Sequence, residues 1–216
     1  VLKERDWHVE IGEEKFPVDK NDFSFTRNGE KILFDFAYIT IHGVPGENGL
    51  LQGYLDMMGV PYGCCNVLAS ALTFDKHTCN TYLKSYGVNV ADSVMLIRGM
   101  AYDVNEIINE VGLPCFVKPN AEGSSFGVTK VKEAAQLEDA LKKAFALCRE
   151  VLIETFIDVT ELTCGVVKAG DMDIAMPIAE VIPKNEFFDF EAKYDPTKSD
   201  EIIPARISPE LTNRIK

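Results

Sequence analysis

The first part of the chain alternates apolar and polar residues in the pattern of a β-strand. Trp7, Val9 and Ile11 are separated by polar positions, and Gly12 interrupts the alternation. A period of two places the apolar side chains on one face of a strand. The dipeptide Asn28-Gly29 predicts a tight turn further along. The chain is therefore expected to begin with strands and turns.

A longer apolar run and an amphipathic helix follow. Residues 32–41 are apolar almost without interruption in their second half, which is typical of a strand buried on both faces of a parallel sheet. His42-Gly43 ends that strand. The loop 46–49 leads into a helix over 50–58, because apolar residues recur there every three or four positions, and Gly59 stops the helix. Together the strand and the helix predict an α/β unit.

The middle of the chain changes character near residue 65, which predicts a domain boundary. A helix begins with Asn66 as its N-cap, and a second helix ends at Gly87. A strand over 94–97 and a short helix over 105–111 come next. The mixture of helices and strands continues to the end of the chain, and the expected fold class is α/β (α+β).

In the sequence, the clearest helix follows two expected strands and precedes a third. Residues 115–131 form a strand, a Gly/Ser loop and a second strand. In the helix over 133–149, apolar residues recur at spacings of three and four, so that face is expected to pack on the sheet. Residues 151–154 form an apolar strand that ends in a carboxylate, and a further strand is expected over 161–167.

Composition limits the classes of function. With 216 residues, of which 46% are hydrophobic, the chain can bury a substantial core. The longest nearly apolar run, 67–74, is far too short to span a bilayer, so no membrane partner is expected. The net charge of −12 argues against a nucleic-acid partner, whose phosphates would be repelled. An anionic substrate would need a local basic pocket, for which Lys76, Lys118, Lys193 and Arg206 are available.

The cysteines predict reduced thiols. Their spacing contains no C-x-x-C pair, and Cys115 and Cys148 fall on apolar faces of expected elements. We therefore expect reduced, mostly buried thiols, which are typical of a cytoplasmic protein. The six cysteines are Cys64, Cys65, Cys79, Cys115, Cys148 and Cys164.

The Gly/Ser loop between two strands has the chemistry to hold phosphate. Gly123 and Gly127 allow the backbone to approach a ligand closely, and the loop amides can donate to phosphate oxygens. Ser124 and Ser125 add hydroxyl donors, and Lys118 adds a positive charge. Neither a Walker A loop nor a G-x-G-x-x-G motif is present, so phosphates would be held in another way. Taken alone, a Gly/Ser loop between two strands is more often a purely structural turn, because turns need these residues.

A histidine and two glutamates are further candidates. His42 ends the expected parallel strand, and ligands bind outside that end of such strands, although a capping role fits it too. Glu154 ends one apolar strand and Glu161 begins another, so both can accept hydrogen bonds from ribose hydroxyls or an adenine amine. A single glutamate at a strand end is also commonly a solvated charge.

An ordered set of motifs resembles one known family. Taken together, the motifs resemble the D-alanine–D-alanine ligases of the ATP-grasp superfamily, and the match runs nearly from end to end. The motifs are His42-Gly43, Gly46-Glu47-Asn48-Gly49, Asp75-Lys76, Lys118-Pro119, Glu122-Gly123-Ser124-Ser125, Gly127-Val128, Glu154, Glu161 and Glu191-Ala192-Lys193-Tyr194.

The resemblance implies an ATP-grasp fold preceded by a Rossmann-like domain with a parallel sheet, both incomplete here. It implies three parts: residues 1–65 as part of an N-terminal substrate-binding α/β domain, 66–153 as the central ATP-grasp subdomain, and 154–216 as part of the C-terminal ATP-grasp subdomain. We therefore expect this sequence to be a partial one, without the family's first Gly-rich strand-loop and its late metal-binding carboxylates.

The resemblance also implies roles for individual residues. The residues that would bind ATP are Lys76, Lys118, Ser125, Glu154 and Glu161, with Ile157 beside the adenine and Phe187 closing over it. The catalytic residues would be Ser124, Tyr194, His42 and Lys193. In this reading Lys193 and Lys118 balance phosphate charge, and His42 lies near the reacting carboxylate. Thr155 stands where a lysine often follows the first glutamate, which leaves open how the adenine edge is contacted.

The implied reaction joins two D-alanines for peptidoglycan synthesis. ATP would phosphorylate the carboxylate of one D-alanine, and the amine of the second would then displace phosphate. The implied cofactors are ATP and Mg²⁺ or Mn²⁺, with metal ligands outside these residues. Relatives are usually homodimers, and the expected location is the cytoplasm.

Three alternatives remain open. The first is a D-Ala-D-lactate ligase, although the resemblance places the Tyr194 hydroxyl in contact with Ser124 over the second substrate, which favours D-Ala-D-Ala over D-Ala-D-lactate as product. Another ATP-grasp carboxylate–amine ligase is the second alternative. The third is a truncated, inactive fragment that retains a nucleotide-binding grip.

Overall fold

The chain forms two compact units. The computed structural model describes residues 2–3, 6–195 and 197–216, and the units are Val1–Tyr82 and Leu83–Lys216. Each unit has a hydrophobic core of its own. The three-part division expected from the sequence stays a prediction.

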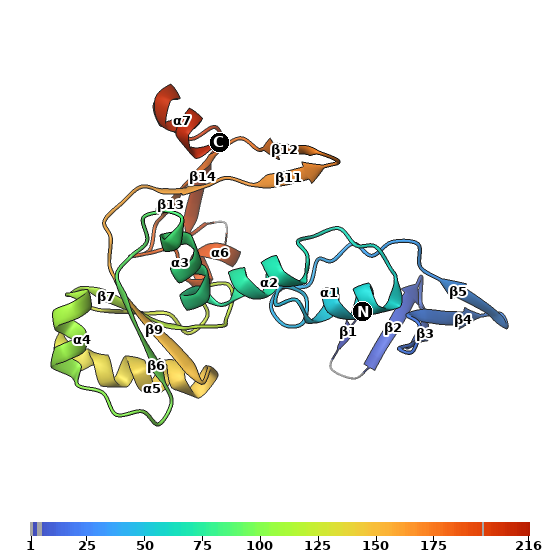
Figure 1. The fold of residues 1–216 in the computed structure, drawn as a ribbon, viewed down its shortest axis with the longest axis horizontal. Helices are drawn as coiled ribbons and strands as arrows, with labels where there is room; N and C mark the ends of the chain where they lie inside the picture. Colours follow the sequence, from blue (N-terminus) through green and yellow to red (C-terminus); the bar gives the residue numbers. More distant parts are fainter. Residues whose placement is uncertain (1, 4–5, 196) are drawn as a thin grey trace. The chain divides into compact units, whose positions relative to one another are not determined.

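The first unit begins with an antiparallel sheet of five consecutive strands, in the order β1-β2-β3-β4-β5 (Figure 1). The alternating segment at the start of the chain lies in β2, as predicted. Asn28 and Gly29 have left-handed backbone angles, with φ of 52° and 81°, and they form the predicted tight turn between β4 and β5. The strands are β1 Leu2–Lys3, β2 Asp6–Ile11, β3 Glu14–Asp19, β4 Ser24–Arg27 and β5 Glu30–Leu33.

The prediction of a parallel strand over 32–41 is wrong. Beyond β5 the backbone makes one isolated parallel bridge, between Ala37 and Tyr62. An apolar run becomes a sheet strand only where neighbouring strands supply hydrogen bonds along its length, and the described residues supply that single bridge. As a consequence Tyr38, in the middle of the run, is 78% exposed. The described strands of this unit pair antiparallel rather than in the expected parallel sheet.

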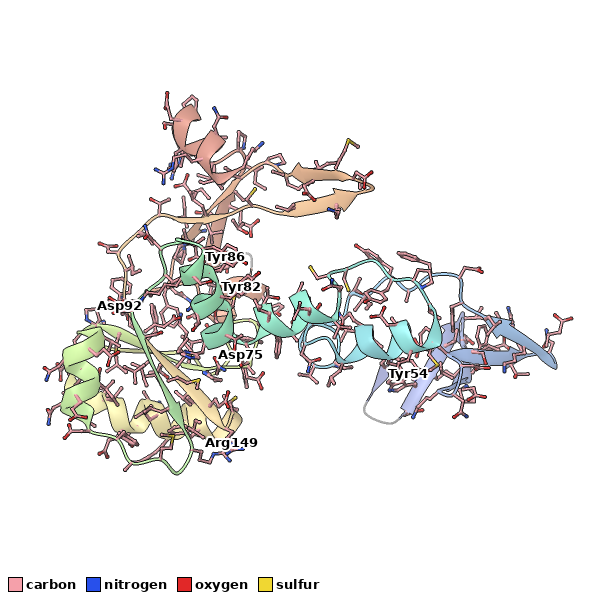
Figure 2. The ribbon with its side chains drawn as sticks, in the orientation of Figure 1. Tyr54, Asp75, Tyr82, Tyr86, Asp92 and Arg149 are labelled. Atoms are coloured by element: carbon pink, nitrogen blue, oxygen red, sulfur yellow. The ribbon has the colours of Figure 1, made fainter. Side chains whose placement is uncertain are left out.

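The predicted helix over 50–58 packs on this sheet. It is present as α1, and Gly59 ends it in a left-handed conformation with φ of 69°. Leu51 and Leu55 are buried in the core of the unit. Tyr54, labelled in Figure 2, meets the Trp7 ring edge-on at a centroid distance of 5.3 Å. The apolar side of α1 therefore lies in the same hydrophobic cluster as Leu2 and Trp7 of the strands.

Two further helices follow α1. The Asn66 side chain accepts a hydrogen bond from the Ala69 amide at 2.9 Å, which confirms Asn66 as an N-cap. In the same way the Asp75 carboxylate accepts from the Thr78 amide at 2.8 Å. The helices are α1 Leu50–Met58, α2 Val67–Phe74 and α3 Lys76–Ser85.

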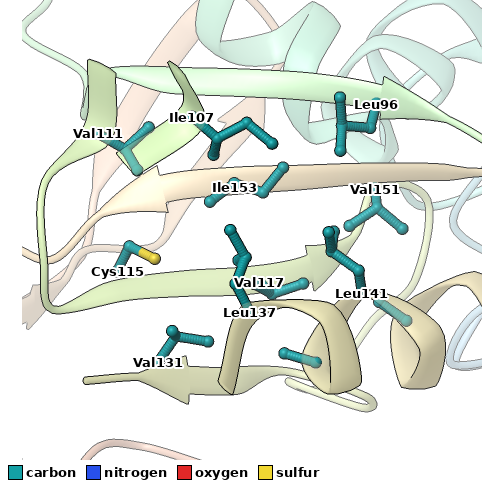
Figure 3. Close-up of a cluster of buried hydrophobic side chains, with 12 residues drawn as sticks. Leu96, Ile107, Val111, Cys115, Val117, Val131, Leu137, Leu141, Val151 and Ile153 are labelled. Atoms are coloured by element: carbon teal, nitrogen blue, oxygen red, sulfur yellow. The ribbon is translucent and has the colours of Figure 1, made fainter. Parts of the chain in front are cut away.

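The second unit is built on a four-stranded antiparallel sheet in the order β6-β9-β7-β8. Helices α4 and α5 cover one face of this sheet, and their apolar side chains interlock with those of the strands in one buried cluster (Figures 1 and 3). Val117, Ile153 and Leu137 are fully buried there. The elements are β6 Ser93–Ile97, α4 Val104–Val111, β7 Cys115–Pro119, β8 Thr129–Val131, a 3-10 turn Ala134–Gln136, α5 Leu137–Leu147 and β9 Glu150–Thr155.

Smaller elements complete this unit. One sheet has the order β10-β13-β14, and β11 and β12 form a separate hairpin. The prediction of a single strand over 161–167 is wrong. The chain leaves the sheet β10-β13-β14 after Thr163 and enters the hairpin of β11 and β12 at Val166. The elements are β10 Glu161–Thr163, β11 Val166–Ala169, β12 Met172–Ala175, β13 Ala179–Pro183, α6 Phe190–Tyr194, β14 Ser199–Ile202 and α7 Pro209–Ile215.

The cysteines are free but differ in exposure. Cys115 is buried, whereas Cys64 and Cys65 are exposed and the other three are intermediate. The expectation of mostly buried thiols is therefore wrong, because Cys115, the first residue of β7, is the one cysteine among the described residues that is buried. Burial raises the pKa of the Cys115 thiol. None of the helices in the described part of the chain is long and apolar enough to cross a membrane.

Candidate functional site

The two faces of the sheet β6-β9-β7-β8 carry different side chains. Successive residues of a strand point to opposite faces. Val117 and Ile153 face the helices, in the buried cluster of Figure 3. Phe116 and Lys118 of β7 and Glu154 of β9 alternate with these residues and therefore point the other way. The face opposite the helices is called the site face below.

Two predicted residues meet on the site face. The Lys118 ammonium and the Glu154 carboxylate form an ion pair. Their strands are neighbours, and the register sets Phe116 opposite Glu154, so Lys118 lies diagonally across from it. The Glu154 side chain is 10% exposed and the Lys118 side chain 24%, so both charges are largely withdrawn from water. A paired lysine in this position can share its charge with an incoming anion.

Two more predicted residues, Glu161 and Lys193, belong to the same group of charges. Surrounding protein atoms raise the pKa of the Glu161 carboxyl through desolvation, although the residue as a whole is exposed. The positive charges of Lys193 and, to a smaller extent, Lys118 oppose this rise. Lys118 thus pairs with Glu154 and, together with Lys193, acts electrostatically on the Glu161 carboxyl. Such a cluster can bind a polar ligand that carries both negative charges and hydrogen-bond donors.

The Gly/Ser loop between β7 and β8 has an unusual backbone. Ser124 and Ser125 both have positive φ angles, 52° and 56°, and Gly127 has 73°. Non-glycine residues rarely adopt this region, so the loop is held in place by its surroundings. A Cβ atom on Gly127 would lie 2.3 Å from the Leu147 side chain and 3.0 Å from the Pro119 ring. Only a residue without a side chain lets the loop lie this close to β7 and α5.

Residues 184–194 contact this loop. The Ser125 hydroxyl donates to the Phe188 carbonyl at 3.0 Å. The Ser124 and Tyr194 hydroxyls lie 2.7 Å apart, so the contact expected between them is present. The Phe126 ring also meets the Phe190 ring at a centroid distance of 5.9 Å. These residues, called segment 184–194 below, are thus attached to the loop at several points.

An aromatic cluster links the site face to the same segment. The Phe116 ring meets the Phe187 ring in a T-shaped arrangement at 5.1 Å and the Phe156 ring at 5.8 Å. The Lys118 ammonium lies 5.2 Å from the centroid of Phe116. Phe187, predicted to close over a nucleotide, is therefore seated on the strand that carries Lys118.

Thr155 and Ile157, which follow Glu154, differ in their surroundings. The Thr155 hydroxyl donates to the Val111 carbonyl at 2.8 Å, so this side chain ties β9 to α4. Ile157, predicted to lie beside the adenine, is 50% exposed in the loop after β9. Its predicted role stays a prediction.

His42 and Lys76 belong to the first unit. His42 Nδ1 lies 3.8 Å from a Glu47 carboxylate oxygen, and the same carboxylate accepts from the Gly43 amide at 2.6 Å. The His42 side chain is 77% exposed. Lys76 is the first residue of α3, directly after the Asp75 cap. Their part in a common site with the second unit stays a prediction.

Two groups of charges were not predicted from the sequence. Lys130 and Lys132 form ion pairs with Glu186, at 3.4 Å and 2.7 Å. The alternation of β8, in which Val131 is buried, could have placed Lys130 on the site face, but nothing local pointed to its partner. Arg206, considered for a basic pocket, instead holds the Glu180 carboxylate through two side-chain hydrogen bonds of 3.0 Å and 2.7 Å. These bonds lower the pKa of Glu180 to about 2.

The site does not include a metal centre that these residues could build. Among residues 2–3, 6–195 and 197–216, no three His, Cys, Asp or Glu side chains gather as a group able to hold a metal ion.

Comparison with known families identifies the second unit. Residues 82–216 match the family model described as "D-ala D-ala ligase C-terminus". A curated relative, the D-alanine–D-alanine ligase of Bacteroides fragilis (strain YCH46), is 53% identical over the full 216 residues. The chain spans 66% of the length of that relative.

Solved structures agree with this match. The D-Ala:D-Ser ligase VanG from Enterococcus faecalis superimposes with a TM-score of 0.76 at 33% identity, over 94% of this chain and 61% of that one. The D-alanine–D-alanine ligase from Bacillus anthracis, solved as a complex with ATP, gives a TM-score of 0.69 at 30% identity, over 84% of this chain and 56% of that one. The predicted fold class is thereby confirmed, since these neighbours have the ATP-grasp fold.

Proposed function

Because this chain belongs to the family of D-alanine–D-alanine ligases, we propose that it serves in the ATP-dependent joining of two D-alanines to D-alanyl-D-alanine, for the synthesis of peptidoglycan precursors. A carboxylate does not react usefully with an amine, because oxide is a poor leaving group. In the proposed reaction the γ-phosphoryl group of ATP passes to the carboxylate of one D-alanine, and ADP leaves. The amine of the second D-alanine attacks the resulting acyl phosphate, and phosphate leaves as the amide bond forms.

The proposed work of the protein is to position these groups and to neutralise their charge. Phosphoryl transfer needs little covalent help from an enzyme, so fixed positive charges and oriented donors supply most of the catalysis. Lys118 and Lys193 are proposed to balance the phosphate charge. The loop carrying Ser124 and Ser125 is proposed to cover the phosphates with its hydroxyls and amides.

The nucleotide is proposed to lie between the site face and segment 184–194. Glu154 and Glu161 would accept hydrogen bonds from its polar groups, and Phe187 would lie over its adenine with Ile157 beside it. Lys76 would add a further contact from α3, and His42 would lie near the reacting carboxylate. These assignments extend the family resemblance to the individual residues of this chain.

Tyr194 is proposed to favour D-alanine as the second substrate. Its hydroxyl lies 2.7 Å from that of Ser124, and this contact fixes the tyrosine relative to the phosphate loop. The neighbouring D-Ala:D-Ser ligase in the comparison joins a different second residue, so second-substrate choice varies among related proteins. We therefore propose D-Ala-D-Ala rather than D-Ala-D-lactate as the product.

Mg²⁺, or Mn²⁺, is proposed to accompany ATP, as phosphoryl transfer usually requires. Among the described residues, no group of His, Cys, Asp and Glu side chains could hold such an ion. A homodimer is proposed as the assembly by analogy with the family. The free thiols and the use of ATP favour the cytoplasm as the place of action.

The observation that carries the proposal is the largely buried Lys118–Glu154 ion pair beside the Gly/Ser loop, with Glu161 and Lys193 in electrostatic range of Lys118 or of each other. The four side chains come from different elements, yet Lys118 pairs with Glu154, and both lysines act on the Glu161 carboxyl. A structural ion pair needs two charges, whereas four charges beside a Gly/Ser loop suit a nucleotide with its triphosphate.

The proposal is tested by D-alanine-dependent phosphate release from MgATP. We expect release with D-alanine and none with L-alanine, and we expect mass spectrometry to find the D-alanyl-D-alanine dipeptide. The assay is run on the 216-residue chain and on the longest polypeptide that contains it. Absence of dipeptide from both samples, while an ATP analogue still binds, would favour a nucleotide-binding fragment over a ligase.

A further inference from the structure

Glu186 lies between two lysines of the hairpin that β7 and β8 form, called the hairpin in this subsection. One of its carboxylate oxygens is 3.4 Å from Lys130 Nζ and 2.7 Å from Lys132 Nζ. Lys130 lies within β8 and Lys132 directly follows it, whereas Glu186 lies about fifty positions later, near the start of segment 184–194. The two ion pairs therefore attach this segment to the strand that follows the Gly/Ser loop.

The environment of Lys130 makes this attachment more than a surface contact. The Lys130 side chain is 10% exposed, and its ammonium lies 3.8 Å from the centroid of the Phe156 ring. A positive charge withdrawn from water needs an anion or an aromatic face nearby, and here it has both. Hydrogen bonds from Lys132 and then from Lys130 lower the pKa of Glu186, so its carboxylate stays ionised at neutral pH.

The residues that follow Glu186 are those predicted to meet the ligands. Phe187 packs on Phe116 of the site face. Phe188 accepts the hydrogen bond from Ser125 through its carbonyl, and Tyr194 meets Ser124. These later contacts involve single hydroxyls and ring edges, whereas Glu186 contributes two charged contacts at one point. Among these contacts with the loop, the site face and β8, Glu186 is thus the strongest candidate for an anchor.

We propose that Glu186 is a positioning residue, whose ion pairs with Lys130 and Lys132 hold segment 184–194 against the hairpin before any ligand binds. The segment is then ordered in advance, and ligands need not supply the free energy to order it. The placing of Phe187 and Tyr194 at a nucleotide and a substrate rests on the proposed function. The attachment itself does not.

The first test measures backbone hydrogen exchange of the ligand-free protein. Glu186→Gln keeps the shape of the side chain and removes its charge. Losing a partly buried charge pair is expected to speed exchange of the amides of segment 184–194 by about three- to tenfold, with no change in α5. The melting temperature is expected to change by less than about 2 °C, because the core on the helix side of the sheet is untouched.

Asp200→Asn is the matched control. It breaks the Lys184–Asp200 ion pair, 2.8 Å long, which joins the same region to β14 rather than to the hairpin. Exchange in segment 184–194 is expected to stay at the wild-type rate in this variant. Equal rates in the wild type and Glu186→Gln, or equal acceleration by Asp200→Asn, would overturn the proposal.

A charge exchange tests the geometry. Glu186→Lys alone should open the segment further than Glu186→Gln, because three lysines then repel one another. Adding Lys132→Glu restores an attractive pair between the same two positions, and it is expected to return exchange to within about twofold of the wild type. A double variant as open as Glu186→Lys would contradict the proposed attachment.

Kinetics separate this inference from the proposed function. If the ligase assay succeeds, Glu186→Gln is expected to raise the KM for ATP about three- to tenfold and to leave kcat within about twofold, because bound ligand orders the segment again. A lowered kcat at unchanged KM would overturn the positioning role. If the ligase assay fails, the exchange experiment still decides whether Glu186 anchors the segment.

Discussion

The two faces of the sheet β6-β9-β7-β8 are made by the same strands but differ in every other respect. On the helix side, Val117 and Ile153 are fully buried among apolar side chains. On the site face, Lys118 and Glu154 pair with each other beside aromatic rings. A period of two thus lets one strand serve the core and the chemistry with alternate residues. Substitutions on the two faces should therefore have effects of different kinds.

The largest effect on stability is expected on the helix side. Ile153→Ala removes three methyl or methylene groups from the centre of the core and leaves a cavity, which should lower the free energy of unfolding by about 2 to 5 kcal/mol. Urea denaturation measures this value. Ile174→Ala, on the exposed hairpin strand β12, is the matched control and should cost less than about 1 kcal/mol. Similar costs at both positions would mean that the core is not centred on β9.

On the site face, the main loss should be in turnover. Lys118→Ala removes a charge proposed to stabilise the transferring phosphoryl group, and phosphate release at saturating substrates should fall about a hundredfold or more. The assay is run where circular dichroism finds the variant folded. Lys142→Ala, an exposed lysine on α5, should keep wild-type turnover. Near-normal turnover in Lys118→Ala would exclude Lys118 from the proposed role.

Two glutamates on the sheet β10-β13-β14 should respond to pH with opposite signs. The Glu180 pKa is lowered to about 2 by hydrogen bonds from Arg206, so the stability it contributes is present above pH 4.5 and is lost as the pH falls from 4.5 to about 2. The Glu161 pKa is raised by desolvation, so Glu161 costs stability as the pH rises through 4.5 and beyond its raised pKa.

Urea denaturation between about pH 2 and pH 7 measures both effects. Relative to the wild type, Glu180→Gln should lose stability at neutral pH but not near pH 2. Glu161→Gln should gain stability at neutral pH but not at pH values well below 4.5. The same pH profile for both variants would contradict the assignment of opposite environments.

The smallest effect is expected at the rim of the site face. Tyr194→Phe removes one hydroxyl and keeps the ring contact with Phe190, which has a centroid distance of 4.9 Å. Stability should change by less than about 1 kcal/mol, because a single exposed hydrogen bond contributes little. The ratio of dipeptide to D-alanyl-D-lactate, measured by mass spectrometry with both second substrates present, should fall several-fold. An unchanged ratio would remove Tyr194 from the choice of substrate.

Local features of the fold could be predicted from the sequence. The spacing of apolar residues gave α5, the Asn28-Gly29 dipeptide gave the turn between β4 and β5, and Asn66 gave the start of α2. In each case the cause lies within a few residues, either in the helical period or in the backbone angle that a turn requires. Such causes do not depend on the rest of the molecule.

Features that depend on distant partners could not be predicted in this way. The apolar run over 32–41 reads as a strand, but strand formation needs neighbours that the run itself cannot specify. The partner of Lys130 is Glu186, and no local pattern connects two residues so far apart in the chain. The Ser124–Tyr194 contact was expected only because the family resemblance supplied it.

The close seating of Gly127 has a consequence for protein engineering. Because a Cβ there would run into Leu147 and Pro119, the loop takes its shape partly from the end of α5 and the end of β7. Grafting residues 120–128 alone onto another scaffold should therefore yield a loop with a different backbone. The smallest portable module is the strand, the loop and the helix together, from β7 to the end of α5.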